Sequence, residues 1–180
     1  MKSKLKYLLL ATILFACNTT TDINYIVEIN TLNNMGIKEA ISKANEWRVS
    51  LPKIKSYVTT EELVVEFPDG REVHKNLPDN EMYIAIAPYV NFTHSCSTHY
   101  ISTCKAELSN KVLQVIATGA NENIIINDKY TAMDNGFIEL WLPRNRTINI
   151  NIIYGSLSSS ETIITNKDSR TCLTTFKLDE

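Results

Sequence analysis

The sequence predicts an α+β fold, in which a small N-terminal domain with a helix and a hairpin precedes a C-terminal antiparallel β-sandwich. Three observations support this prediction. Apolar residues with helical spacing occur between residues 37 and 47. Short runs of strand-forming residues, separated by polar turns, fill the chain after residue 104. Pro and Gly are scarce, with five of each, so long disorder is not expected beyond an N-terminal tether.

The N-terminus has the features of an export signal. Three lysines precede an apolar run over residues 7–16, which is too short to span a bilayer as a permanent helix. The run ends in Leu-Phe-Ala-Cys, which resembles the lipobox cleaved by the bacterial lipoprotein signal peptidase. We expect residues 1–17 to be a lipoprotein signal peptide and Cys17 to carry lipid, holding the protein at the periplasmic face of a bacterial membrane. In the alternative, Cys17 is incidental to an ordinary signal peptide, and the mature chain is extracytoplasmic in both cases.

Export changes the charge balance. Removing the three leader lysines leaves 15 Lys and Arg against 20 Asp and Glu, a net charge of about −5. Such a balance argues against a nucleic-acid partner and favours cations. About 160 mature residues suffice for one domain or two small ones.

The first domain is expected over residues 31–90, after a polar tether at residues 18–30. Ile37, Ala40, Ile41, Ala44 and Trp47 follow the spacing of one helical face, with Asn34 as the expected N-cap.

Two strands should form a hairpin after this helix. The run at residues 62–67 is rich in strand formers, Pro68-Asp-Gly70 is a turn sequence, and residues 71–75 return the chain. A further strand at residues 82–87 stops at Pro88.

The second domain, residues 91–180, is expected to be the sandwich. Seven short strands in under 80 residues are typical of a small sandwich. Asp134-Asn-Gly136 and Pro143-Arg-Asn145 mark two of the turns. The strands are expected near residues 103–108, 111–118, 123–132, 136–142, 147–154, 160–165 and 172–178.

Three cysteines remain if Cys17 carries lipid, an odd number for an oxidising compartment. Alternation along the expected strands places Cys104 on a face with Leu108, and Cys172 on a face with Phe176. Both thiols should therefore point inward at the edge of the sandwich core. Cys96 lies in the loop that enters the sandwich and could fold over the same edge.

A structural disulfide is one interpretation of these thiols. Pairing Cys104 with Cys172 closes a loop of about 69 residues and stabilises by roughly 4 kcal/mol. Pairing Cys96 with Cys104 closes about nine residues and stabilises by roughly 2.5 kcal/mol. The longer loop is favoured, but it leaves Cys96 unpaired.

A soft-metal site is the second interpretation. Thiolates are preferred ligands of Cu(I) and zinc, and imidazole suits copper or zinc. His94 and His99 flank Cys96, so both are candidate ligands. Three separated thiolates suit trigonal Cu(I) at least as well as tetrahedral zinc. His74, in the hairpin, is expected to be an ordinary surface residue.

Several motifs in order resemble the CueP family of periplasmic copper-resistance proteins. They are Tyr83-Ile-Ala-Ile-Ala-Pro-Tyr-Val-Asn-Phe-Thr-His-Ser-Cys96, then His99, Ser102-Thr-Cys-Lys-Ala-Glu107, Asp134-Asn-Gly-Phe137, Trp141-Leu-Pro-Arg144 and Thr171-Cys-Leu-Thr-Thr175. The resemblance implies an exported copper-binding protein of two domains, in which residues 91–180 bind the copper. It maps the family's three cysteines onto Cys96, Cys104 and Cys172, with His94 and His99 as candidate ligands only. It also implies a homodimer formed through the N-terminal part.

The function expected from this resemblance is copper resistance, by buffering Cu(I) or delivering it to a periplasmic copper enzyme. A thiol-dependent Cu(II) reductase and a disulfide-stapled structural lipoprotein are the alternatives. Catalytic residues of other kinds are not expected, because the sequence has neither a Gly-rich phosphate loop nor an arguable Ser/His/Asp arrangement.

Overall fold

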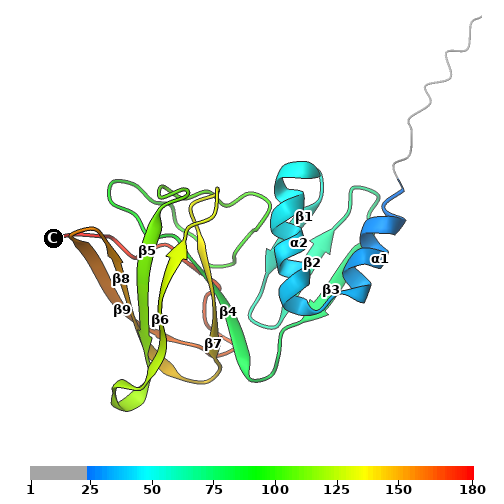
Figure 1. The fold of residues 1–180 in the computed structure, drawn as a ribbon. Helices are drawn as coiled ribbons and strands as arrows, with labels where there is room; N and C mark the ends of the chain where they lie inside the picture. Colours follow the sequence, from blue (N-terminus) through cyan, green and yellow to red (C-terminus); the bar gives the residue numbers. More distant parts are fainter. Residues whose placement is uncertain (1–23) are drawn as a thin grey trace, which may run out of the picture.

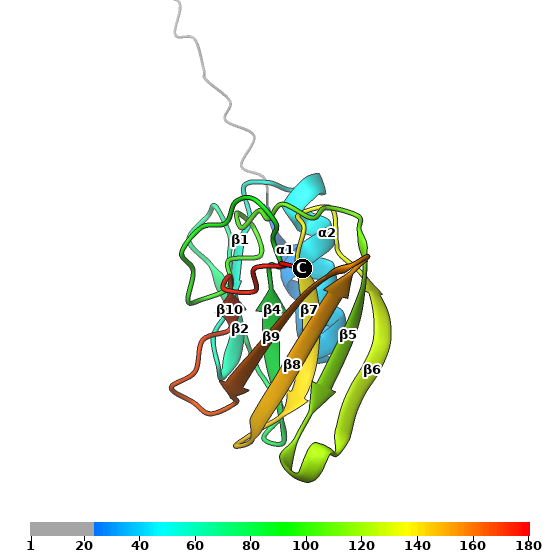
Figure 2. The ribbon, with the colours of Figure 1, turned by 90° about the vertical axis from the view of Figure 1, so that its left-hand side faces the viewer.

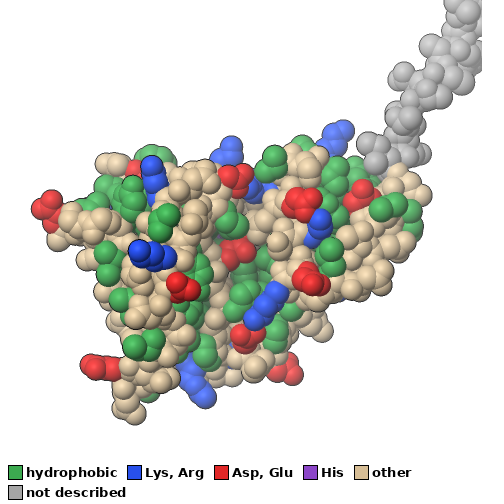
Figure 3. Space-filling model, viewed as in Figure 1, with side chains coloured by type: hydrophobic (Ala, Val, Ile, Leu, Met, Phe, Trp, Pro, Cys, Tyr) green, Lys and Arg blue, Asp and Glu red, His purple; other side chains and the backbone are tan. Residues whose placement is uncertain are grey.

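The computed structural model describes residues 24–180. The expected signal peptide, with Cys17, lies outside the described residues. A unit of two helices and a three-stranded sheet packs beside a larger β-sandwich (Figure 1). No helix among residues 24–180 is both long and apolar enough to cross a membrane. On the face drawn in Figure 3, acidic and basic side chains are interspersed rather than gathered by sign.

Two helices open the described chain. Helix α2 (Ile37–Ser50) confirms the predicted helix, and its Ala40, Ile41, Ala44 and Trp47 are buried. Its N-cap is Gly36, whose N–H donates to the Glu39 carboxylate at 3.1 Å. The prediction that Asn34 caps this helix is wrong, because Asn34 is the last residue of α1 (Ile26–Asn34).

Helix α1 also corrects the expected tether. Residues 26–30 are helical rather than extended, because α1 buries Leu32 completely and packs Ile29 against the same core. Apolar positions three residues apart give this short helix one face to bury.

The hairpin is confirmed as β2 (Glu62–Glu66) and β3 (Glu72–Asn76), joined by a turn in which Gly70 has φ +85°. A strand that the sequence did not predict, β1 (Lys55–Val58), pairs with β2 to complete a sheet of order β1-β2-β3. Four residues are too few to show a convincing alternation on their own.

Two sheets form the sandwich and face each other (Figure 2). One has the order β10-β4-β7 and the other β6-β5-β8-β9. The bounds are β4 (Glu81–Ile86), β5 (Val112–Thr118), β6 (Ile124–Thr131), β7 (Ile138–Pro143), β8 (Thr147–Tyr154), β9 (Leu157–Ile164) and β10 (Cys172–Leu173), with a 3-10 turn η1 (Ala120–Glu122).

Strand β4 separates two hydrophobic cores. Met82, Ile84 and Ile86 pack into the sandwich core, and Tyr83 and Ala85 pack into the core shared with the helices and β1-β2-β3. Alternate residues point to opposite faces of a strand, so one strand serves both cores. Although its residues fall in the range expected for the first domain, β4 pairs with β7 and β10 of the sandwich.

Two expected strands differ from the structure. Residues 103–108 form turns and irregular chain rather than a strand, and regular pairing at the C-terminus ends after Leu173 instead of reaching residue 178. The alternation argument for the thiols therefore fails. Leu108 and Phe176 pack in the sandwich core, but Cys104 and Cys172 lie in the core on the helical side.

Candidate metal centre

Three segments bring the cysteines together. His94 and Cys96 lie soon after β4, and Cys104 follows on the same long connection to β5. Cys172 begins β10, where it pairs in parallel with Ala85 of β4. The Ser97 carbonyl accepts hydrogen bonds from the backbone N–H groups of Thr171 at 3.0 Å and Cys172 at 3.2 Å. These bonds hold the loop that carries Cys96 against β10.

Cys104 is held by its own backbone contacts. Its N–H donates to the Tyr100 carbonyl at 2.8 Å, which closes a tight turn. Two residues later, the Ala106 N–H donates to the Asn135 carbonyl at 2.6 Å. The Cys104 segment is thereby fixed to the turn between β6 and β7.

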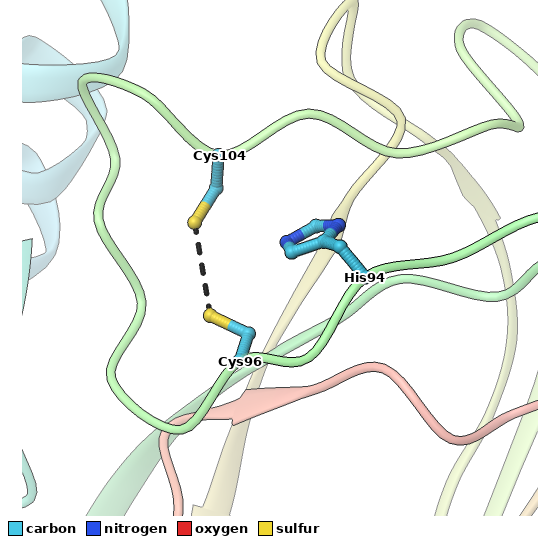
Figure 4. A group of neighbouring side chains, drawn as sticks. All are labelled: His94, Cys96 and Cys104. Carbon is cyan, nitrogen blue, oxygen red and sulfur yellow. Dashed lines mark hydrogen bonds between the residues drawn. The ribbon is translucent and has the colours of Figure 1, made fainter.

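The donor atoms form two groups that share Cys104. In the first, the ligand atoms of His94, Cys96 and Cys104 lie within 4.8 Å of one another, with the two Sγ atoms 3.8 Å apart. Figure 4 shows the His94 imidazole beside this pair of sulfur atoms. In the second, the ligand atoms of His99, Cys104 and Cys172 also lie within 4.8 Å of one another. Within residues 24–180, these are the two groups of three or more His, Cys, Asp or Glu residues that could hold a metal ion.

The spacing suits a metal ion. A thiolate–metal bond is about 2.3 Å long, so donors arranged in a plane around one ion lie about 4 Å apart. The 3.8 Å between the Cys96 and Cys104 sulfurs matches this separation. Both groups contain only sulfur and nitrogen donors, the set that soft and borderline metals select and that hard cations such as Mg²⁺ do not.

Exposure to solvent changes across the centre. His94 is exposed and Cys96 is half-buried, whereas Cys104 is 8% exposed and both Cys172 and His99 are fully buried. An open cavity of about 340 Å³ is lined in part by His94, Cys96 and Cys104. One end of the centre therefore meets solvent and the other does not.

His99 is held firmly but has no partner for its ring. Its carbonyl accepts from the Val58 N–H at 2.9 Å, and its N–H donates to the Thr171 hydroxyl oxygen at 3.1 Å. The ring packs against Phe137, with centroids 4.6 Å apart. Neither ring nitrogen has a hydrogen-bond partner, although both are buried. Buried polar atoms are nearly always paired, so these nitrogens are available to a ligand.

The thiols differ in acidity. A hydrogen bond from Cys172 lowers the pKa of Cys104 to about 3, against the opposing effect of burial. The pKa of Cys172 lies far above its ordinary value, because Cys172 donates to Cys104 and is buried. Burial also raises the pKa of Cys96. These directions make Cys104 the most acidic of the three thiols.

The structure brings all five residues predicted for the site together around Cys104. His74 lies elsewhere, on β3, where its ring hydrogen-bonds with Glu62 at 3.1 Å and Glu72 at 3.0 Å. No signal in the sequence predicts the supporting contact from Thr171 to His99. Thr171 is next to Cys172, but nothing in the spacing of the chain links it to a residue 72 positions away.

The fold and this centre define an α+β protein with a thiol- and imidazole-lined site for a soft metal ion. The chain belongs to the CueP family, whose model, described as periplasmic copper-binding protein CueP, matches residues 37–177. It is also similar to the chain in the crystal structure of S.CueP, with 28% identity, a TM-score of 0.77, and coverage of 84% of this chain and 97% of that one. No curated protein matches the chain. The predicted family and fold class are confirmed, and the family is periplasmic and copper-binding.

Proposed function

We propose that this protein binds Cu(I) through the thiolates of Cys96, Cys104 and Cys172, and that it buffers copper or delivers it to a periplasmic copper enzyme. His94 and His99 are candidate further ligands. The observation that carries the proposal is the convergence of three thiols and two imidazoles, from distant parts of the chain, on one buried sulfur atom. Thiolates select Cu(I), and burial keeps the bound ion away from oxygen and from other sites.

Delivery requires the ion to leave by ligand exchange. The end of the centre that carries Cys96 lines the open cavity, so an acceptor's ligand can approach there. Lipid on Cys17 would keep the protein at the membrane surface while its folded part meets the acceptor.

A homodimer through the N-terminal unit is a further proposal, which sedimentation analysis of the mature chain would test.

An anaerobic titration tests copper binding. The reduced mature chain is titrated with Cu(I) against a competing chelator, and free thiols are counted before and after. We expect one tightly held ion and protection of the cysteine ligands from the thiol reagent. Serine substitutions should weaken binding, most of all Cys104→Ser, because that sulfur belongs to both donor groups. His74→Gln, on β3 and outside the centre, is the matched control and should leave the affinity unchanged.

Two results would contradict the proposal. One is unchanged Cu(I) affinity in all three single cysteine variants. The other is weak binding together with a single titratable thiol, which would point to a structural disulfide and to the stapled-lipoprotein alternative.

A specific observation also favours a second candidate, a thiol-dependent Cu(II) reductase. The Cys96 and Cys104 sulfurs are 3.8 Å apart, and the lowered pKa of Cys104 provides the reactive thiolate. Joining the Cys104 thiolate and the Cys96 thiol in one disulfide releases one proton and two electrons, and the two electrons reduce two Cu(II) to two Cu(I). Repeated Cu(I) production with an added thiol reductant would support turnover. A single burst that is not renewed by the reductant would limit the role to reduction during loading.

A further inference from the structure

The two donor groups differ in their access to solvent while sharing one atom. The outer position is defined by His94, Cys96 and Cys104, and the inner position by His99, Cys104 and Cys172. We propose that these are two successive positions of one Cu(I) ion, which enters at the outer position and moves to the inner one without leaving Cys104. This inference rests on the proposed function for the identity of the ion and deepens it, because the three thiolates then bind the ion two at a time rather than all at once.

The outer position is accessible to an ion that arrives from solvent. His94 is exposed, Cys96 is half-buried, and both line the open cavity with Cys104. Figure 4 shows His94 and Cys96 approaching Cys104 from one segment of chain, so movement of that segment changes two ligands together. A site with one exposed ligand can gain or lose an ion by exchange with a dissolved ligand.

The inner position has buried, fixed ligands that would hold a bound ion tightly. His99 and Cys172 are fully buried, and neither is among the residues that line the open cavity. Both His99 ring nitrogens lack a hydrogen-bond partner, an unusual condition for a buried imidazole that a metal ion would relieve. The backbone bonds of His99 to Val58 and Thr171 fix the ring before any ion arrives. Fixed, desolvated ligands bind without further ordering.

The transfer exchanges two ligands and moves no electron. The bonds from copper to the His94 nitrogen and the Cys96 sulfur break, and bonds to the His99 nitrogen and the Cys172 sulfur form. Cys172 gives up its thiol proton as it binds, and the Cys96 thiolate released in the same step takes that proton. Every donor of either group lies within 4.8 Å of the Cys104 sulfur, so the other two ligands can exchange without copper leaving Cys104.

Matched histidine variants test the two positions separately. For the wild type, His94→Gln, His99→Gln and the control His74→Gln, we would measure the equilibrium Cu(I) affinity and the stopped-flow rates of uptake and of removal by a chelator. His99→Gln should lower the affinity at least about tenfold and speed removal, because it takes a ligand from the inner position. His94→Gln should slow both uptake and removal while leaving the affinity within a few fold of the wild type. His74→Gln should change neither.

Cysteine variants and X-ray absorption extend the test. Cys172→Ser should weaken binding far more than Cys96→Ser, which should mainly slow uptake. X-ray absorption of the wild type with one Cu(I) should show two sulfur ligands and one nitrogen ligand, and this measurement needs no variant to fold.

The outcomes separate this inference from the proposed function. Three sulfur ligands, equal losses in Cys96→Ser and Cys172→Ser, and no effect of His99→Gln would show a single three-thiolate position. The two-position path would then be wrong while copper binding stands. A wild type that binds no Cu(I) would overturn both.

Discussion

Gly136 is the residue at which one added methyl group tests how the Cys104 segment is held. It lies in the turn before β7 with φ +84°, a conformation that L side chains rarely adopt. A Cβ at this position would lie 2.5 Å from the carbonyl oxygen of Ala106 and 2.9 Å from its Cβ. Ala106 is two residues from Cys104, so Gly136→Ala should push directly on the segment that presents the shared ligand.

Gly70→Ala is a matched control that isolates the free-energy cost of the positive φ from the cost of the close contact. Gly70 has φ +85°, but an added Cβ meets nothing within 4 Å. The positive φ alone costs an alanine about 1–2 kcal/mol. At Gly136 the close contact adds roughly 1–3 kcal/mol, the usual range for overpacking. The free energy of unfolding should therefore fall by about 2–5 kcal/mol for Gly136→Ala and by about 1–2 kcal/mol for Gly70→Ala.

Thermal unfolding of the two reduced variants measures the difference. A further loss of 1–3 kcal/mol corresponds to a melting temperature roughly 2–12 °C below that of Gly70→Ala for a chain of this size. Gly136→Ala should also bind Cu(I) more weakly, and Gly70→Ala should bind it as the wild type does. Equal melting temperatures and equal copper affinities in the two variants would refute the argument that the turn at residue 136 positions Cys104.

Three further predictions concern residues outside the donor groups. The Glu107 carboxylate accepts hydrogen bonds from the three backbone N–H groups of residues 90–92, so Glu107→Gln should cost about 2 kcal/mol of unfolding free energy at neutral pH. Burial acts to raise the pKa of Glu107, but hydrogen bonds from Asn91 and the backbone hold it below its ordinary value. Its contribution is thus present above the unfolded pKa and lost as pH falls through the folded one, and the gap between variant and wild type in chemical denaturation should narrow below about pH 4. Hydrogen bonds to two glutamates raise the pKa of His74, so NMR titration should find it above the usual value; the resulting stability is full below the unfolded pKa and is lost as pH rises through the folded one. Arg144 donates to the backbone carbonyls of Pro78, between β3 and β4, at 2.9 Å and of Thr60, between β1 and β2, at 2.6 Å. Arg144→Ala should lower the unfolding free energy by about 1–3 kcal/mol without rescue by lysine, which lacks the forked geometry. An unchanged melting temperature for Arg144→Ala, or a His74 pKa at or below its usual value, would contradict the corresponding statement.

Local patterns predicted the parts of the fold in which neighbouring residues decide the structure. The helix at residues 37–50 and the hairpin around Gly70 were predictable, because periodicity and turn chemistry act over a few residues. The strand expected at 103–108 was wrong for the complementary reason. The segment has strand-like alternation, but its Ala106 N–H bonds to the Asn135 carbonyl instead of a neighbouring strand.

The candidate site was predictable in its composition but not in its arrangement. Clustering in the sequence brought His94, Cys96, His99 and Cys104 to attention, and the count of cysteines that remain beside Cys17 added Cys172. That the thiols lie in the core on the helical side, rather than at the edge of the sandwich core, depends on the pairing of β10 with β4. That pairing joins residues 87 positions apart, and a local pattern carries no information about such a contact.

The sequence by itself determined which chemistry this protein has available: three cysteines and two histidines with a preference for soft metals, in a chain of the CueP family. Only the tertiary structure decided that Cys104 is shared by two donor groups, one open to solvent and one closed. The physical reason is that burial and the distances between donor atoms arise from packing between distant segments. The residues of the chain determine which ligands are present, and their packing determines which of these ligands can hold the same ion.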